Sequence, residues 1–168
     1  RPEGLRTVVI DPRYTLDAAK AEVWLPIRPG TDAALLLTWT RWILENEKYD
    51  EEFCRAWTNM PYLINPETRL TLKATEAGLP GTDQDYVIWD PAKNAPVVVE
   101  YPFNEGVAAP LFGTFEVNGM QCKTSGQLLK ESCEEWTLEK GAEVCWLDAG
   151  QIERALEIYT DPAGQSGI

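Results

Sequence analysis

Histidine is absent from the 168-residue chain. The chain therefore lacks the side chain that most often serves as a general base near neutral pH. The four cysteines, Cys54, Cys122, Cys133 and Cys145, are widely spaced and form no C-x-x-C pair. A zinc site would need four scattered thiolates, so free thiols in a reducing compartment are the simpler interpretation. Any chemistry must then come from a cofactor or from residues outside this chain.

Positive charge is also scarce, because 15 Lys and Arg face 27 Asp and Glu, for a formal net charge of -12. Binding to nucleic acid depends mainly on clustered basic side chains, so we expect no nucleic-acid partner. No segment approaches the roughly 20 apolar residues that span a bilayer, so we expect no membrane contact from this segment. A single anionic ligand, held by local amides and an arginine, remains compatible with this composition.

Two further absences concern nucleotide motifs and the start of the chain. Neither G-x-G-x-x-G nor G-x-x-x-x-G-K-[ST] occurs, so the usual dinucleotide and triphosphate signatures are missing. The chain begins at Arg1 rather than Met and enters a strand within a few residues. We therefore expect a piece excised from a longer protein. Its compartment, cytoplasmic or periplasmic, stays unknown because a targeting signal would precede Arg1.

The first sixty residues alternate between strand and helix patterns. Residues 7–10 and 23–27 are short apolar strands, and a helical turn near residues 18–21 separates them. Apolar residues at spacings of three and four predict helices over residues 32–46 and 50–57. Thr31 or Asp32 is expected to cap the first of these helices. This order predicts an α/β fold class with a partial Rossmann-like open parallel sheet.

Hairpins and helices are predicted after residue 60. Residues 60–84, rich in proline and glycine, indicate an irregular connection. Hairpins are predicted over residues 85–101 and 112–124, and Asn118-Gly119 is the stronger of the two turn signals. Helices are predicted over residues 125–134 and 148–160, the latter capped by Asp148. We expect a nucleotide-binding lobe over residues 1–75 and a hairpin-and-helix segment of an adjoining lobe over residues 76–168.

The chain holds seven tryptophans, which could indicate an aromatic ligand site. Trp39 and Trp42 lie on the apolar stripe of the helix predicted at residues 32–46, and Trp57 continues such a stripe. Core packing is therefore the favoured interpretation of these three side chains.

Polar turns come after both predicted strands of the first lobe. These turns hold Asp11, Pro12, Arg13, Tyr14 and Thr15 after the first strand, and Arg28, Gly30, Thr31 and Asp32 after the second. If the strands are neighbours, both turns lie at the edge where open α/β sheets bind ligands. A carboxylate there can accept two hydrogen bonds from guanine or from ribose hydroxyls, and an arginine can meet a phosphate. On spacing alone, two capped turns, with Asp32 serving only its helix, are favoured.

A resemblance to a known family changes this balance. The stretch "VVIDPRYTLDAAKAEVWLPIRPGTDAALLL", followed by "ILENEKYDEEFCRAWTN", resembles the nucleotide-binding lobe of molybdenum and tungsten enzymes of the dimethyl sulfoxide reductase family. The close match covers roughly the first sixty residues, and several separated motifs agree. The later segments "AAPLFGTFEVNGMQCKTSGQLLKE" and "EKGAEVCWLDAGQIERALEIYT" are similar to the region after this lobe in that family, more loosely but in the same order.

The resemblance implies binding of bis-molybdopterin guanine dinucleotide with molybdenum or tungsten. The two turns would hold one guanosine end, with Asp32 at the guanine edge and the turn of Asp11 at the ribose. The family's metal ligand, its pterin-binding C-terminal domain and any 4Fe–4S cluster lie outside this chain. The chain itself therefore has no expected catalytic or metal-binding residue, and no activity is expected from it alone. Its expected partners are an iron–sulfur electron-transfer subunit and the rest of the catalytic subunit.

The expected function is thus part of a molybdopterin-dependent oxidoreductase that runs two-electron chemistry in the full-length protein. The substrate stays open, since acetylene hydratase-like members of the family perform no net redox reaction. The alternative is a stand-alone acidic α/β interaction or scaffold domain without a cofactor.

Overall fold

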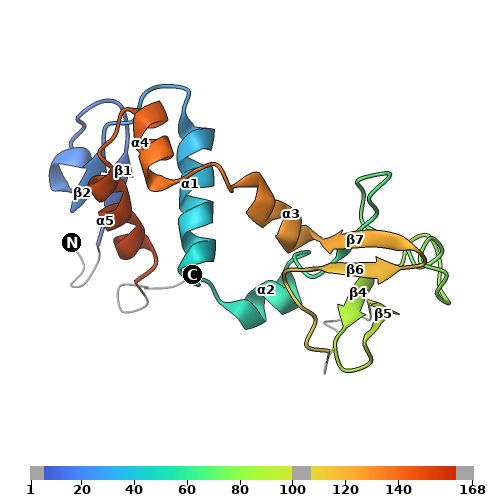
Figure 1. Cartoon of the computed structure of the whole chain (residues 1–168). Coiled ribbons are helices and arrows are strands. Elements are labelled where there is room, and N and C mark those ends of the chain that lie inside the picture. Colours follow the sequence, from blue (N-terminus) through green and yellow to red (C-terminus); the bar gives the residue numbers. More distant parts are fainter. Residues whose placement is uncertain (1–5, 100–106, 162–168) are drawn as a thin grey trace. The chain divides into compact units, whose positions relative to one another are not determined.

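The computed structural model describes residues 6–99 and 107–161, which fold as two compact units (Figure 1). Unit 1 joins Arg1–Tyr49 to Cys133–Ile168, and unit 2 is Asp50–Ser132. These contact-based bounds differ from the predicted functional division at residue 75, which stays a prediction. The C-terminal helices thus belong to the same unit as the N-terminal strands.

The sheet of unit 1 consists of β1 (Val8–Ile10) and β2 (Val23–Leu25). The two strands pair in parallel, with Val8 opposite Val23 and Ile10 opposite Leu25. A short 3₁₀ helix, η1 (Ala18–Lys20), lies in the connection between them. This arrangement confirms the predicted parallel sheet within an α/β fold. It also places the residues after both strands at the same edge.

Three α-helices are present among the described residues of unit 1. The helices α1 (Asp32–Glu45) and α5 (Ala149–Tyr159) were predicted, and the Asp148 carboxylate caps α5 by accepting a hydrogen bond from the Gln151 amide at 2.9 Å. The helix α4 (Leu138–Cys145) was not predicted. Its cap is Thr137, whose hydroxyl oxygen accepts from the Lys140 amide at 3.1 Å. In Figure 1, α4 lies beside α1, and α5 lies beside the two strands.

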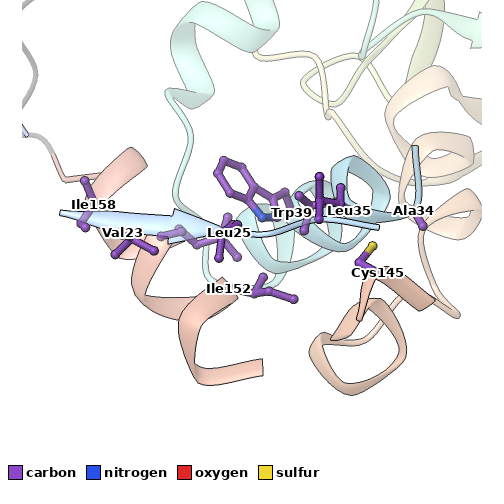
Figure 2. Close-up of a cluster of buried hydrophobic side chains, with 11 residues drawn as sticks. Val23, Leu25, Ala34, Leu35, Trp39, Cys145, Ile152 and Ile158 are labelled. Atoms are coloured by element: carbon purple, nitrogen blue, oxygen red, sulfur yellow. The ribbon is translucent and has the colours of Figure 1, made fainter. Parts of the chain in front are cut away.

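A single apolar cluster holds the strands and helices of unit 1 together. Figure 2 shows Leu25 of β2 among side chains from α1 and α5, including Leu35, Trp39 and Ile152. Each of these four side chains is at least nine-tenths buried, and partly buried Trp42 packs against the cluster. Burying apolar surface of this kind supplies most of the free energy that keeps such a unit folded. The core role expected for Trp39 and Trp42 is confirmed.

The described residues of unit 2 form two helices and two antiparallel sheets. Its elements are α2 (Glu51–Trp57), β3 (Leu63–Ile64), β4 (Val87–Asp90), β5 (Ala95–Val98), β6 (Thr114–Val117), β7 (Met120–Thr124) and α3 (Ser125–Ser132). One sheet has the strand order β3-β7-β6, and β4 pairs with β5 in the other. Among the residues described in both units, no helix is long and apolar enough to cross a membrane.

Both predicted hairpins are present in unit 2. The β6–β7 turn is Asn118-Gly119, with φ of 50° and 77°. Two consecutive positive φ angles are typical of the type I′ turn, which matches the twist of the strands and explains why this dipeptide predicts a hairpin. The β4–β5 hairpin pairs Val87 with Val98. The end of its predicted second strand, residues 100–101, lies outside the described residues.

Two expectations for unit 2 need correction. Residues 60–84 were expected to form only an irregular connection, but they supply β3 and the fully buried side chains of Leu63 and Leu72. The strand β3 has two residues and depends on its pairing with β7, which no local pattern can reveal. Trp57 was expected in a core, but 63% of its surface is exposed. Its ring stacks on the Phe53 ring, with 6.5 Å between the ring centroids.

Helix α4 packs closely against Thr38 of α1 at Gly141, which makes this a sensitive position. A Cβ at Gly141 would lie 2.8 and 2.9 Å from the Cγ2 and Cβ of buried Thr38. Overpacking of this kind costs about 1–3 kcal/mol, whereas replacing a helical glycine by alanine gains at most about 1 kcal/mol. We expect Gly141→Ala to lower the urea midpoint of unfolding, followed by circular dichroism.

The matched control is Gly150→Ala in α5. The added methyl group would meet only the Asp148 carboxylate oxygen, at 3.2 Å, on an exposed surface. This variant should unfold at or somewhat above the unmodified midpoint, because it gains helix propensity without overpacking the core. Equal midpoints for Gly141→Ala and the unmodified chain would contradict the close α1–α4 contact.

Candidate functional site

The first turn begins at Asp11, which is fixed to the end of β2 by its backbone. Its amide donates to the Leu25 carbonyl at 3.2 Å, and its carbonyl accepts from the Trp24 indole Nε1 at 2.8 Å. Its carboxylate Oδ1 accepts from the Arg13 amide at 2.7 Å. No other hydrogen bond to this carboxylate is present among the described residues. One carboxylate oxygen therefore shapes the turn, and the other remains available to a ligand.

The remaining residues of the first turn divide into exposed and structural ones. Pro12, Arg13 and Tyr14 are exposed, and the Tyr14 ring meets the Trp24 ring edge-on at 4.9 Å between centroids. The Thr15 hydroxyl accepts from the Ala18 amide at 3.2 Å, at the start of η1. Thr15 thus holds the connection in place, while the three preceding side chains face solvent.

The second turn reverses the chain between β2 and α1. The Arg28 carbonyl accepts from the Thr31 amide at 3.3 Å and from the Thr31 hydroxyl at 2.7 Å. Gly30 has a φ of 83°, which glycine adopts far more readily than other residues, although a Cβ there would meet no atom within 4 Å. The conformation, rather than the space, accounts for glycine at this position.

The structure changes the capping role expected of this turn. Thr31 occupies the N-cap position of α1, but its side chain accepts no hydrogen bond from the helix and instead donates to Arg28. Asp32 is the first helical residue, and its exposed carboxylate has no hydrogen-bond or ion-pair partner among the described residues. By contrast, Asp50 caps α2 by accepting from the Phe53 amide at 2.8 Å. Asp32 therefore acts on its helix only through the macrodipole.

The two turns together present the donors and acceptors that a nucleotide requires. The carboxylates of Asp11 and Asp32 can accept hydrogen bonds from a base edge or from ribose hydroxyls. Arg13 and Arg28 have no ion-pair partner among residues 6–99 and 107–161, whereas Arg6 pairs with Glu22 and Asp161 elsewhere in unit 1. The side chains at this edge therefore fit the nucleoside and phosphate groups of a ligand.

Sequence reasoning missed a third contributor to this edge, Trp146. The Arg28 amide donates to the Cys145 carbonyl at 3.0 Å, so the end of α4 is attached to the second turn. The Arg28 guanidinium lies over the Trp146 ring, 4.5 Å from its centroid. These residues are more than a hundred positions apart, and only the exposed aromatic residue next to an unpredicted helix end could have signalled the contact.

The described residues do not fit a metal. They contain no group of three or more His, Cys, Asp or Glu side chains placed to hold a metal ion. All four cysteines are free, with Cys122, Cys133 and Cys145 buried and Cys54 partly exposed, as the free-thiol interpretation predicted. Burial raises the pKa of the Cys54 thiol, and the carboxylates of Asp50 and Glu51 raise it further. The accessible thiol is therefore not an activated nucleophile.

Two surface hollows of unit 1 lie away from the turns. One, of about 260 Å³, includes Arg41, Trp42 and Trp136, and the other, of about 420 Å³, includes Lys48 and Glu157. Neither contains a residue of the two turns. The side chains of Arg13, Arg28 and Asp32 are exposed, so the edge formed by the turns lies at the surface of the described residues.

No family model matches the chain, but individual known proteins are similar to it. A putative dimethyl sulfoxide reductase catalytic subunit from Halobacterium salinarum is 32% identical over 165 residues, which cover 98% of this chain and 19% of that protein. A selenate reductase subunit from Mesobacillus selenatarsenatis is 32% identical over 181 residues, which cover 98% of this chain and 17% of that protein. The chain thus spans at most 19% of the length of these relatives.

Among solved structures, acetylene hydratase from Pelobacter acetylenicus is similar to the chain. The TM-score is 0.48 and the sequence identity is 24%, with 94% of this chain and 13% of the acetylene hydratase chain covered.

The raised pKa of Cys54 predicts slow alkylation. In the folded chain at pH 8, iodoacetamide should modify Cys54 severalfold more slowly than a cysteine in an unstructured peptide, because less of the thiol is ionised and the side chain is partly buried. Peptide mass spectrometry over time gives the rate. Glu51→Gln should speed the reaction by removing one neighbouring negative charge. A Cys54 rate equal to or above that of the peptide would indicate an activated thiolate and contradict this interpretation.

Proposed function

We propose that this chain, which belongs to the molybdopterin oxidoreductase family of catalytic subunits, supplies the guanosine-binding turns of a longer enzyme. The family implies a molybdopterin cofactor, and the form proposed here is bis-molybdopterin guanine dinucleotide with molybdenum or tungsten. The observation that carries the proposal is the pairing of β1 with β2, which brings two carboxylate-bearing turns to one sheet edge. Open α/β sheets bind nucleotides at such edges.

Asp32 is assigned to the guanine base. A carboxylate can accept hydrogen bonds from the N1–H and the N2 amino group of guanine together, a pair of donors that adenine lacks. The Asp32 carboxylate is exposed and has no partner among the described residues, so binding would displace only water. Its position at the start of α1 also places its negative charge at the positive end of the helix dipole.

The first turn is assigned to the ribose and its neighbouring phosphate. The Asp11 carboxylate has one oxygen bonded to the Arg13 amide and a second that can accept from a ribose hydroxyl. The exposed guanidinium groups of Arg13 and Arg28 suit a phosphate, because arginine can donate two hydrogen bonds to it in a bidentate arrangement. Pro12, Tyr14 and Thr15 shape this turn, while Gly30 and Thr31 shape the second.

The chemistry of the enzyme lies outside this chain. When bound, the cofactor supplies a metal that carries out two-electron chemistry. This chain contributes binding and orientation of the nucleotide end, and none of its described residues is assigned to catalysis or metal ligation. Because Arg13, Arg28 and Asp32 are exposed, the rest of the catalytic subunit is proposed to cover the nucleotide. The proposed electron carriers are a 4Fe–4S cluster and an iron–sulfur subunit, and the substrate is left open.

The decisive test is the composition of the natural full-length protein. Purified under anaerobic conditions, it should contain molybdenum or tungsten by elemental analysis. Acid treatment should release about two guanine nucleotides per metal, because two pterin dinucleotides surround one ion. A protein with neither metal and no guanine nucleotide would refute the proposed function.

A pair of aspartate variants separates ligand binding from helix capping. Asp32→Ala should lower the guanine nucleotide content of the full-length protein from about two toward about one per polypeptide, because the turns hold one of the two guanosine ends. Stability should change little, because the Asp32 carboxylate makes no cap hydrogen bond. Asp50→Ala should keep the nucleotide but lose about 1 kcal/mol of stability, since its cap bond to the Phe53 amide disappears. Nucleotide assay and urea unfolding of both variants give the comparison. Equal nucleotide contents would remove Asp32 from the site.

A further inference from the structure

Trp146 combines an uncommon backbone conformation with an exposed ring. It ends α4 with a φ of 59°, in the left-handed region that residues with bulky side chains rarely occupy. Residues in this conformation usually carry small side chains, and glycine is the commonest at helix ends. The large indole gains little from burial in exchange, because 70% of the residue's surface is exposed. Neither local geometry nor core packing therefore explains tryptophan at this position.

The surroundings of Trp146 connect it to the second turn. The Cys145 thiol lies 3.5 Å from the Thr31 carbonyl oxygen, and the Cys145 carbonyl accepts from the Arg28 amide. The residues directly after Cys145 and Thr31 are Trp146 and Asp32. The Arg28 guanidinium, over the Trp146 ring, gives a third contact between the end of α4 and the turn. The exposed indole is thus held beside the edge at which the nucleotide is proposed to bind.

We propose that Trp146 is a stacking residue of the nucleotide site, which takes the face of the guanine base whose edge Asp32 binds. This inference rests on the proposed function and adds a residue and a type of contact to it. The Arg28 guanidinium lies over one face of the indole, but 70% of the surface of Trp146 stays exposed, so flat apolar surface remains for a base to stack on. Base–aromatic stacking is a common source of affinity in nucleotide recognition because every base has a π-face.

The two contacts have different consequences for recognition. A carboxylate distinguishes bases by the hydrogen-bond donors at their edges, so Asp32 contributes selectivity for guanine. An indole stacks on any base, so Trp146 contributes affinity without selectivity. Arg28 can contact the Trp146 ring and a phosphate at the same time. A guanidinium that stacks on an aromatic ring keeps its edge free to donate to a phosphate. Loss of the ring should therefore weaken retention of the nucleotide while leaving the rest of the site intact.

The test uses the natural full-length protein with its cofactor and measures two quantities other than activity. One is the guanine nucleotide released by acid per polypeptide, and the other is the rate at which nucleotide is lost from dilute protein. Trp146→Gly removes the ring and suits the left-handed backbone, so the fold should be as stable as before or more so. We expect its rate of nucleotide loss to rise at least about fivefold, the lower range for removal of one base–aromatic stack.

Two further variants make the result specific to the ring. Trp146→Phe keeps an aromatic face and should restore most of the retention seen in the unmodified protein. Trp57→Ala removes a tryptophan of similar exposure, 63%, from unit 2 and should leave both nucleotide quantities unchanged. The melting temperature of each cofactor-free protein shows whether a lower retention reflects unfolding.

The outcomes distinguish the inference from the function on which it rests. Unchanged retention in Trp146→Gly, together with loss in Asp32→Ala, would overturn the role of Trp146 and leave the proposed function standing. A Trp146→Gly protein with a lower melting temperature and lost nucleotide would indicate packing against another part of the protein, and would also overturn it. Absence of guanine nucleotide from the unmodified protein would refute the proposed function itself.

Discussion

The parallel pairing of β1 with β2 is the constraint on which the candidate site depends. The pairing puts the carboxyl ends of both strands at one edge, so two turns separated by more than ten residues of sequence lie next to each other. The Asp11 amide extends the pairing by donating to Leu25, and the Trp24 indole donates to the Asp11 carbonyl. A shift of one residue in register would turn the buried face of β2, including Leu25, toward the wrong side. Core and site are therefore specified by the same pairing.

The C-terminal helices fix the second turn from the opposite end of the sequence. Beyond its own local bonds, the turn before α1 accepts at the Thr31 carbonyl from the Cys145 thiol, and its Arg28 amide donates to the Cys145 carbonyl. That bond exists because Gly141 lets α4 approach Thr38 of α1 closely, which brings the end of α4 to the turn. The buried contact between Gly141 and Thr38 thus helps to place the end of α4, including Trp146, beside the second turn.

The sequence predicts those features that local chemistry decides, and it fails where distant contacts decide. The strand β1, the helix α1 and the Asn118-Gly119 hairpin result from periodicity and turn chemistry, and the structure confirms each. The helix α4 has eight residues with a glycine in its middle, so its own helical preference is low and packing on α1 compensates. Asp11 and Asp32 could be identified as candidates because both come after strands, whereas Trp146 reaches the edge only through the tertiary contacts of α4.

An acidic chain can still present a surface for an anionic ligand, because exposed charges act mainly over short distances. At physiological ionic strength, charges separated by more than about 8 Å are largely screened, so the total charge of -12 matters less than the nearest side chains. In the two turns those are Arg13 and Arg28, neither of which is neutralised by a carboxylate among the described residues. Asp32 and Asp11 add negative charge beside these arginines, but their carboxylates can accept hydrogen bonds from the donors of a base and a ribose. A nucleotide, which is anionic at its phosphate and rich in donors elsewhere, matches this mixed pattern better than a simple anion does.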